Sequence, residues 1–423
     1  MLLYLRVLRH RDFRYLFAGQ AASQIGDRVV VVALALFITQ RTGSPADLGL
    51  VLGAQSLALV ALLLFGGVWA DRWGGPGRIK IMIGTDLTRA ALHATLAVLI
   101  VTDEVTVWQL VVLEGLFGAA QAFFQPAYSG LLPQTVPESL IQDARALTEA
   151  MANVAFLAGP AIATALVLGV GAWEAFALDA ATFLFSAAML VRVSTRSRGE
   201  SAAAESVAHA LRVGWREVRS RSWVWVTIAV FTGAVLCVYA PWYSLAPVIA
   251  RDHYGGAGVF GVLESIAGVG AVCGGVIGLS WRPARPLFAG MLLVLAWPLN
   301  DGLYALGAPV PVLVVTVFAT GFGFSLLMVW WETALARHIP AGALSRVSAW
   351  DWMGSLALLP LGFLLAGPLA ASVGARTVLG VGSAIGAVLL LAGLLPRATR
   401  ELGEETSTEQ FARDVGVAAG REA

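Results

Sequence analysis

Charge is scarce in this sequence. Asp, Glu, Lys and Arg together make up 13% of its 423 residues, and lysine occurs once, as Lys80. Soluble domains usually carry about 25% charged residues. The formal net charge is +1, so the chain has no global positive field that would attract nucleic acid. We therefore expect neither a soluble protein nor a nucleic-acid-binding protein.

Cysteine is nearly absent, and so are the motifs of catalysis. Cys237 and Cys273 both fall inside apolar runs without metal-binding or redox spacing, so we predict no disulfide, no metal site and no cofactor. No GxxxxGK(S/T) phosphate loop occurs, which excludes a primary ATP-driven pump in this chain. No hydrolytic constellation is recognisable, and the five histidines are scattered, as His10, His93, His209, His253 and His338. The sequence predicts no enzyme.

Long apolar runs take the place of charge. Hydrophobic residues make up 58% of the chain, and the mean hydropathy is +0.77. An α-helix needs about 20 apolar residues to cross a bilayer core. Twelve runs come near this length, at 14–40, 47–70, 80–102, 106–131, 146–170, 174–193, 223–248, 257–280, 285–307, 311–335, 347–371 and 375–396. We predict an all-α polytopic membrane protein with twelve transmembrane helices.

The arginines predict the orientation of these helices. Basic residues gather in alternate gaps between the runs, whereas the other gaps hold only Arg41, Arg251 and Arg376. By the positive-inside rule, both termini are then cytoplasmic. We interpret the basic gaps as topology signals and as contacts with lipid headgroups. The preference for arginine over lysine, with abundant alanine, glycine and valine, is typical of GC-rich bacterial genomes, so we expect a multi-pass protein of a bacterial inner membrane.

One long gap divides the chain into two blocks of six runs. The predicted parts are an N-terminal bundle at 1–193, a cytoplasmic linker at 194–222, a C-terminal bundle at 223–396 and a cytoplasmic tail at 397–423. Apolar residues at helical spacing from Val207 to Val218 predict an amphipathic helix within the linker. Pro160 and Pro360 occupy corresponding runs of the two blocks, as in parallel-repeat transporters, with chance pairing as the alternative.

The turn after the second run carries a recognisable motif. Residues 67–74 read GVWADRWG, followed by Arg78 and Lys80. Gly67 permits close helix approach, Asp71 can neutralise a neighbouring helix N-terminus, and the basic residues can pair with acids. This turn resembles the signature loop of the major facilitator superfamily. It departs from that loop because three residues, 75–77, separate Gly74 from the basic pair.

Further short motifs narrow the family. They include RDFR at 11–14, Gly26 and Asp27, DLTRA at 86–90, FQPA at 124–127, Asp179 and Ala180, and LPLG at 359–362. Their order and spacing resemble the macrolide-efflux and enterobactin-exporter branch. The resemblance implies the major facilitator fold of two six-helix pseudo-repeats, small-molecule and proton partners, and a monomer.

A Gly-Pro pair in the fifth run resembles the antiporter motif of proton-coupled exporters. Gly159 and Pro160 carry it, although Ala163 and Thr164 stand where small glycine steps usually follow. Physically, proline frees a backbone carbonyl and lets a helix bend. A proline kink without a coupling role is the alternative.

Ionisable groups inside the runs are candidates for proton coupling. Asp27 and Arg28 fall near the middle of the first run, and Glu114 and Glu264 lie about 12 Å from the outer ends of theirs. An unpaired charge in hydrocarbon is costly. Burial favours a neutral carboxyl group and a nearby arginine favours the charged form. Asp27 is the first candidate for the proton-coupling residue, with Arg28 or Arg89 as its partner, and Glu264 and Glu114 are the next candidates. A static, hydrogen-bonded packing role is the alternative for each of these acids.

A cytoplasmic gate and a substrate pocket complete the hypothesis. Asp86 and Arg89 are three apart on one helix and can pair locally. The predicted gate that holds the outward-open state closed inside consists of Gly67, Asp71, Arg72, Arg78, Asp86 and Arg89 from one block and Glu332, Arg346 and Asp351 from the other. The pocket candidates are Gln20, Gln24, Phe117, Phe124, Trp242, Tyr243, Trp330 and Trp331. Aromatic rings with a few acids suit lipophilic or cationic compounds, although an interfacial aromatic belt also explains many tryptophans.

Three functions are compatible with these features. The first is a secondary exporter of drug-like molecules or natural products, driven by proton antiport with alternating access. The second keeps the fold and moves a siderophore or a lysophospholipid. The third is a sensor or assembly partner that has lost transport. The motif at 67–74 and the charges within the runs are evidence against this third function.

Overall fold

The computed structural model describes residues 4–72, 74–194, 207–278 and 280–403, and within these ranges every regular element is a helix. Twelve helices are long and apolar enough to cross a membrane. Each overlaps one of the twelve predicted runs. The predicted all-α, twelve-helix class is therefore confirmed.

The N-terminal half contains six long helices. They are α1 (Arg11–Arg41), α2 (Pro45–Arg72), α3 (Gly74–Val101), α4 (Val107–Leu131), α5 (Ile141–Gly169) and α6 (Ala172–Leu190). Short 3-10 helices lie at Leu132–Gln134 (η2) and Glu138–Leu140 (η3). Within this half, α1 packs against α5 and α6, and α2 packs against α4. The predicted helical kink at Pro160 does not break α5, which is continuous through that residue.

Three spans of the C-terminal half are divided, which the apolar runs did not reveal. The seventh consists of α8 (Ser222–Ala234), a π-helical turn η4 (Val235–Tyr239) and α9 (Ala240–His253); the ninth of α11 (Pro286–Val294) and α12 (Ala296–Leu306); the eleventh of α14 (Ala341–Leu356) and α15 (Leu359–Val373). Pro241, Pro298 and Pro360 stand just after the three interruptions. A proline has no backbone N–H and its ring clashes with the preceding turn. The helices α10 (Gly258–Gly278), α13 (Val310–His338) and α16 (Ala375–Ala392) are undivided, and α17 (Arg397–Arg400) follows them.

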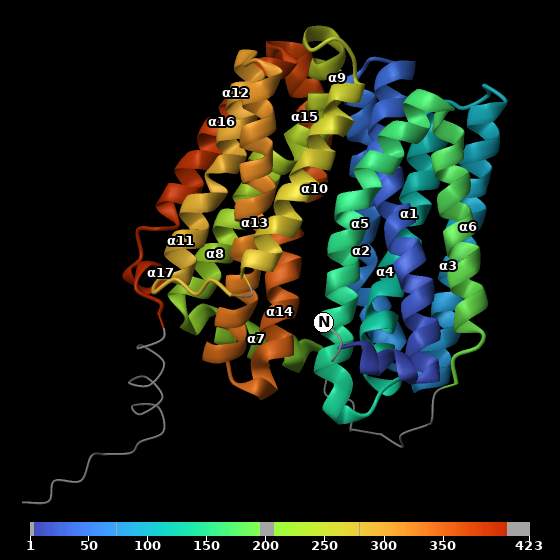
Figure 1. Cartoon of the computed structure of the whole chain (residues 1–423), viewed down its shortest axis with the longest axis vertical. Coiled ribbons are helices and arrows are strands. Elements are labelled where there is room, and N and C mark those ends of the chain that lie inside the picture. Colours follow the sequence, from blue (N-terminus) through green and yellow to red (C-terminus); the bar gives the residue numbers. More distant parts are fainter. Residues whose placement is uncertain (1–3, 73, 195–206, 279, 404–423) are drawn as a thin grey trace, which may run out of the picture.

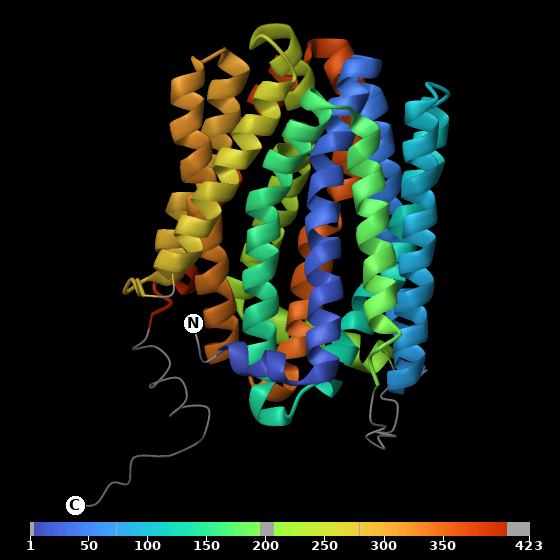
Figure 2. The ribbon, with the colours of Figure 1, turned by 45° about the vertical axis from the view of Figure 1, so that its right-hand side comes forward.

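Two short helices lie beside the bundle at one end. The 3-10 helix η1 (Tyr4–Arg9) crosses the ends of α1 and α5 (Figure 2). The helix predicted in the linker is present as α7 (Val207–Ser220), which packs against α14 (Figure 1). Its Val218 is buried, whereas Arg212, Arg216 and Arg219 are exposed. We call the end of the molecule that carries η1 and α7 the linker end, and the opposite end the far end.

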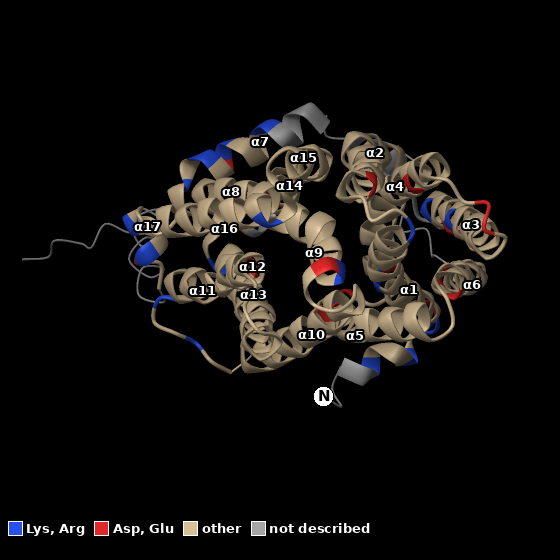
Figure 3. Ribbon diagram, turned by 90° about the horizontal axis from the view of Figure 1, so that it is seen from above, with Lys and Arg blue, Asp and Glu red and all other residues tan. Residues whose placement is uncertain are grey.

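The two halves pack together at the far end and diverge toward the linker end (Figure 1). One buried apolar cluster contains residues of both halves, among them Leu36, Leu48, Ala246 and Phe363. Toward the linker end, the buried clusters of the described residues each belong to a single half: Phe13 and Leu131 are in one, Trp223 and Leu335 in another. Viewed from the far end, α5 lies beside α10 and α2 beside α15 between the halves (Figure 3).

Glycines permit this closure of the far end. A Cβ on Gly367 would overlap the backbone of Ala46, and one on Gly49 would overlap the carbonyl oxygen of Phe363. Small residues let helix backbones approach closely in this way. Arg251 adds a hydrogen bond across the halves, from Nη1 to the backbone oxygen of Thr39 at 3.2 Å. The far end is therefore a backbone-to-backbone contact.

Candidate functional site

A cavity of about 220 Å³ lies between the two halves. The N-terminal half contributes its acidic and amide groups, and the C-terminal half contributes aromatic rings. Its wall includes Asp27, Gln55, Ser56, His93, Phe117 and Gln121 on one side and Tyr239, Tyr243, Leu359 and Phe363 on the other. A site with walls from both halves changes shape whenever the halves move relative to each other.

Asp27 reaches this cavity from the middle of α1. Its Oδ1 atom is buried and has no hydrogen-bond partner among the described residues. The expected pairing of Asp27 with Arg28 or Arg89 is not found: Arg28 lies over the ring of Phe156 at 5.2 Å, and Arg89 pairs with Asp86. Asp27 is thus an acid at the cavity wall without a cationic side chain bonded to it.

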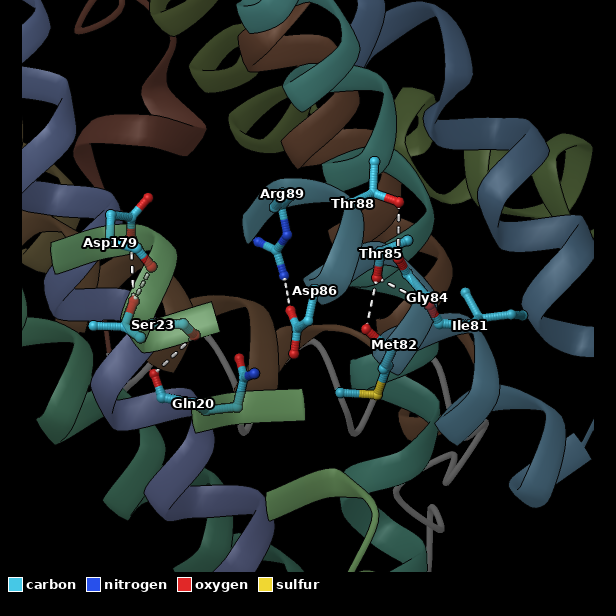
Figure 4. Close-up of polar contacts among 11 residues, drawn as sticks. Gln20, Ser23, Ile81, Met82, Gly84, Thr85, Asp86, Thr88, Arg89 and Asp179 are labelled. Atoms are coloured by element: carbon cyan, nitrogen blue, oxygen red, sulfur yellow. Dashed lines mark hydrogen bonds and ion pairs between the residues drawn. The ribbon is translucent and has the colours of Figure 1, made fainter. Parts of the chain in front are cut away.

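Asp86 and Arg89 form the local pair that the sequence predicts. Arg89 Nη2 donates to Asp86 Oδ1 at 2.5 Å, and both side chains are buried (Figure 4). The guanidinium lies 4.2 Å from the ring centres of Phe124 and Phe183. Because these rings come from α4 and α6, the pair is enclosed within the N-terminal half. In this conformation the pair does not lie between the halves, and its predicted place in a gate that closes in the outward-open state stays a prediction.

His93 is the centre of a polar cluster that the sequence analysis missed. Its Nδ1 atom lies 2.5 Å from Asp179 Oδ2, and its Nε2 atom lies 3.6 Å from Glu114 Oε1. The imidazole stacks on Phe117, with ring centres 4.3 Å apart and an angle of 2° between the planes. All three polar side chains are fully buried. We refer to Asp179, His93 and Glu114 as the triad.

Close packing of α1 against α6 brings the triad near Asp27. Gly26, directly before Asp27, lies against Asp179 Oδ1, and a Cβ at this position would overlap that oxygen. Thr182 donates to the same oxygen at 3.2 Å. A sequence signal for the triad existed, because Asp86, Arg89 and His93 recur at the spacing of one helix face.

Glu264 and its aromatic neighbours form a second polar group, in the C-terminal half. Its Oε1 accepts a hydrogen bond from Trp242 Nε1 and its Oε2 one from Tyr243 Oη, each at 2.7 Å. Three predicted residues are thus brought together. Both oxygens of the carboxyl group have a donor, and Tyr243 faces the cavity.

Comparison with known families identifies the chain. A family model described as a transmembrane secretion effector, within the major facilitator superfamily, matches residues 4–297. The chain belongs to this family. Macrolide efflux protein A of Streptococcus pyogenes is 26% identical over 274 residues, which cover 63% of this chain and 65% of that protein. The chain thus matches slightly less than two thirds of that relative's length.

A second relative aligns along nearly the whole chain. Multidrug efflux pump Tap of Mycobacterium tuberculosis is 28% identical over 411 residues, covering 92% of this chain and 94% of that protein. These relatives agree with the macrolide-efflux branch that the sequence motifs resemble.

Solved structures confirm the major facilitator fold. A mutant of the nucleoside transporter NupG superposes with a TM-score of 0.70 at 12% identity, over 91% of this chain and 98% of that one. A bacterial homologue of the human lysosomal transporter Spinster, in an inward-facing and unoccupied conformation, superposes with a TM-score of 0.68 at 14% identity. The match covers 96% of this chain and 98% of that one.

Several pocket residues predicted for this major facilitator protein lie elsewhere. Trp330 and Trp331 are buried inside the C-terminal half, where Trp330 Nε1 donates to the backbone oxygen of Trp281 at 3.1 Å and Trp331 Nε1 to Asp351 Oδ2 at 2.7 Å. Phe124 packs on Arg89. These aromatic side chains do not line the cavity between the halves.

The predicted amides are also outside the cavity wall. Gln20 is buried on α1, and its Nε2 has no hydrogen-bond partner among the described residues. The Oε1 of Gln24 is also buried and has no hydrogen-bond partner among them. Trp242 reaches the site through Glu264, and Phe117 lines the cavity directly.

A buried pair in the ninth span also escaped the sequence analysis. Asn300 Nδ2 donates to Asp301 Oδ1 at 3.3 Å, and Thr316 Oγ1 donates to Asn300 Oδ1 at 2.8 Å. Two adjacent polar residues in an apolar run are the signal that could have found it. The group lies within the C-terminal half.

The gate residues are only partly described. The predictions for Gly67, Asp71 and Arg72 concern side chains outside the described part of the structure. Arg78 Nη1 donates to the backbone oxygen of Gly130 at 3.0 Å. Glu332 is exposed and Asp351 is held by Trp331.

The antiporter-motif glycine has a packing role. Gly159 of α5 lies directly on the backbone of Arg28 in α1, where a Cβ would overlap. Thr164, the departure from the motif, hydrogen-bonds to the backbone oxygen of Pro160 at 2.8 Å and fills the space over Gly261 of α10. The motif region is therefore part of the contact between the halves.

Proposed function

We propose that this protein is a secondary active exporter of drug-like or natural-product small molecules, driven by proton antiport across a bacterial cytoplasmic membrane. The observation that carries the proposal is the cavity between the halves, whose wall combines the unpaired acid Asp27 with aromatic rings. The relatives named macrolide and multidrug efflux proteins support the class of substrate.

Alternating access follows from the packing of the two halves. Under the positive-inside rule the linker end, with η1 and α7, is cytoplasmic, so a far end that is closed corresponds to an inward-facing state. A substrate then enters from the cytoplasm, the halves rock, and the far end opens. In the outward-facing state, Asp71 and Arg72 would meet Glu332 and Arg346 to close the cytoplasmic end.

The cavity chemistry favours lipophilic organic cations as cargo. Phe117, Tyr239, Tyr243 and Phe363 offer apolar and cation–π contacts, and Asp27 offers a negative charge. Its volume of about 220 Å³ is below the roughly 300–1,000 Å³ of drug-sized pockets. A large substrate therefore requires the halves to separate further.

We propose that the protein is a monomer and that lipid headgroups bind at its basic end.

The test is transport by the purified protein in proteoliposomes, with ethidium as the fluorescent cation. Transport driven by an imposed pH gradient, and lost when the gradient is collapsed, supports the proposal. The matched control is Asp27→Asn. If the protein transports no ethidium in either condition and moves an iron-free siderophore or a lysophospholipid instead, that compound replaces the proposed substrate class.

A further inference from the structure

We propose that the triad of Asp179, His93 and Glu114 holds the transported proton, and that a monovalent organic cation entering the cavity displaces this proton from His93 Nε2. The inference rests on the proposed function and goes beyond it, because it places the proton behind the cavity wall and sets the charge of the cargo.

His93 connects the cavity with the interior of the N-terminal half. The residue belongs to the cavity wall, whereas Asp179 and Glu114 do not. Asp179 holds Nδ1 at 2.5 Å, and the parallel ring of Phe117 fixes the plane of the imidazole. Nδ1 is thus the anchored nitrogen, because it has a close acceptor and a locked orientation.

Nε2 is the nitrogen from which a proton can leave. It has no hydrogen-bond partner among the described residues, and Glu114 Oε1 stands 3.6 Å away. Both oxygens of Glu114 are likewise buried without a hydrogen bond. A buried carboxyl group and a buried ring nitrogen without partners are costly unless a proton lies between them part of the time.

The charges around His93 require an additional proton. Asp27 of α1, Glu114 of α4 and Asp179 of α6 are the acids that interact with it from the neighbouring helices, and α2 adds only the neutral Gln55 and Ser56 to the cavity wall.

On the helix of His93 itself, Asp86 and Arg89 neutralise each other. With a neutral imidazole, the three carboxylates and the guanidinium of Arg28, which acts on Asp27, would leave a charge of about −2 in a low-dielectric site. A second proton on His93 reduces this charge to about −1. Such groups share protons as one unit.

The exchange step is balanced in charge and atoms. In the loaded state His93 carries protons on both nitrogens. When a monovalent cation occupies the cavity, the Nε2–H bond breaks and its electron pair stays on Nε2. The proton leaves with water in the cavity, either directly or by way of the Asp27 carboxylate, which releases it again and stays charged beside the cation. The Nδ1–H bond to Asp179 remains. One positive charge enters as one leaves.

The test is ¹⁵N NMR of histidine in the full-length protein in nanodiscs, with tetraphenylphosphonium as the cation. Five histidines give few signals, and loss of one set in His93→Gln assigns His93. We expect Nδ1 to stay protonated while Nε2 alone responds to pH. Glu114→Gln should move the midpoint of that response by about one pH unit or more. The exposed acid Glu332 provides the matched control, Glu332→Gln, which should leave it in place.

Each result decides the inference. A His93 midpoint that is the same in Glu114→Gln overturns the shared proton, whether or not the protein transports anything. Tetraphenylphosphonium that binds by equilibrium dialysis without changing Nε2, or that does not bind at all, overturns the displacement step. Failure of the proposed function would give a different result: the triad would titrate as expected, but no substrate would show pH-driven transport.

A transport measurement separates this role from a structural one. In proteoliposomes, His93→Gln should lower the ratio of pH-driven uptake to equal-pH exchange of tetraphenylphosphonium about tenfold. A merely structural histidine would lower both rates together and leave the ratio unchanged. His338→Gln, at the linker end, is the control with the same substitution.

Discussion

Replacing Gly367 by alanine should open the far end of the molecule. In the structure a Cβ at this position overlaps the Cα and nitrogen of Ala46 in α2. Backbone atoms cannot rotate away, so the two halves must separate or shift. The overlap exists only while the far end is closed.

The expected size follows from the cost of overpacking. An inserted methyl group in a packed contact costs about 1–3 kcal/mol, which corresponds to about a 5–150-fold change in a two-state equilibrium. Alanine also has a higher helix propensity than glycine. The gain in helix propensity does not change the ratio, because α15 is helical whether the far end is closed or open. The ratio of closed to open far ends should therefore fall by at least about fivefold.

Distances between spin labels at the far end measure this ratio. Val170 and Leu306 are 71% and 78% exposed and belong to different halves, so cysteines there accept labels without disturbing the packing. Cys237 and Cys273 are first replaced by serine. Pulsed electron–electron double resonance should show a larger population of long label-to-label distances in Gly367→Ala than in the parent protein.

Two other glycines provide the controls. Gly53→Ala acts on the same helix pair but meets the flexible side chain of Leu364, with the nearest atom at 2.7 Å, so its effect should be smaller. Gly84→Ala has nothing within 4 Å and should have no effect. An unchanged distance distribution in well-expressed Gly367→Ala would refute the reasoning, as would equal shifts in all three variants.

Three further predictions follow from single side chains. Asp27→Asn should abolish pH-driven transport, because an amide cannot take up a proton; undiminished proton-driven exchange would rule out Asp27 as a proton carrier. Arg89→Gln should destabilise the protein by about 3–5 kcal/mol, since it leaves Asp86 buried without its cation; thermal unfolding measures this, and adding Asp86→Asn should restore most of it. Asp71→Asn should abolish transport at normal expression, and unchanged transport would remove Asp71 from the proposed gate.

The fold was predictable because a bilayer imposes strong constraints on sequence. The length of an apolar run and the number of such runs set the number of helices. The interruptions in the C-terminal half were not predictable from hydropathy, since Val235–Tyr239 and Leu295 are as apolar as their neighbours. The prolines that follow them marked these places, but a proline inside a membrane helix more often only bends it.

The site was only partly predictable, because pairing depends on distances between helices. Asp27, Glu114 and Glu264 were identified as acids in apolar runs, and the structure places Asp27 at the cavity. Their partners lie on other helices, so the bonds of Glu264 to Trp242 and Tyr243 could not be derived. His93 was missed although it shares a helix face with Asp86 and Arg89, because its partners Asp179 and Glu114 lie on other helices.

The two halves contribute different chemistry to the cavity. Asp27 and Glu114 of the N-terminal half, near His93, have buried oxygens without a donor among the described residues, while Glu264 of the C-terminal half has a donor on each oxygen. A satisfied carboxylate fixes its neighbours, so Glu264 orients the aromatic wall through Tyr243 and Trp242. Asp27 shares the cavity with that wall. In the proposed antiport mechanism, coupling between proton and cargo would require no conducting path through the C-terminal half, because both would compete for the same space between the halves.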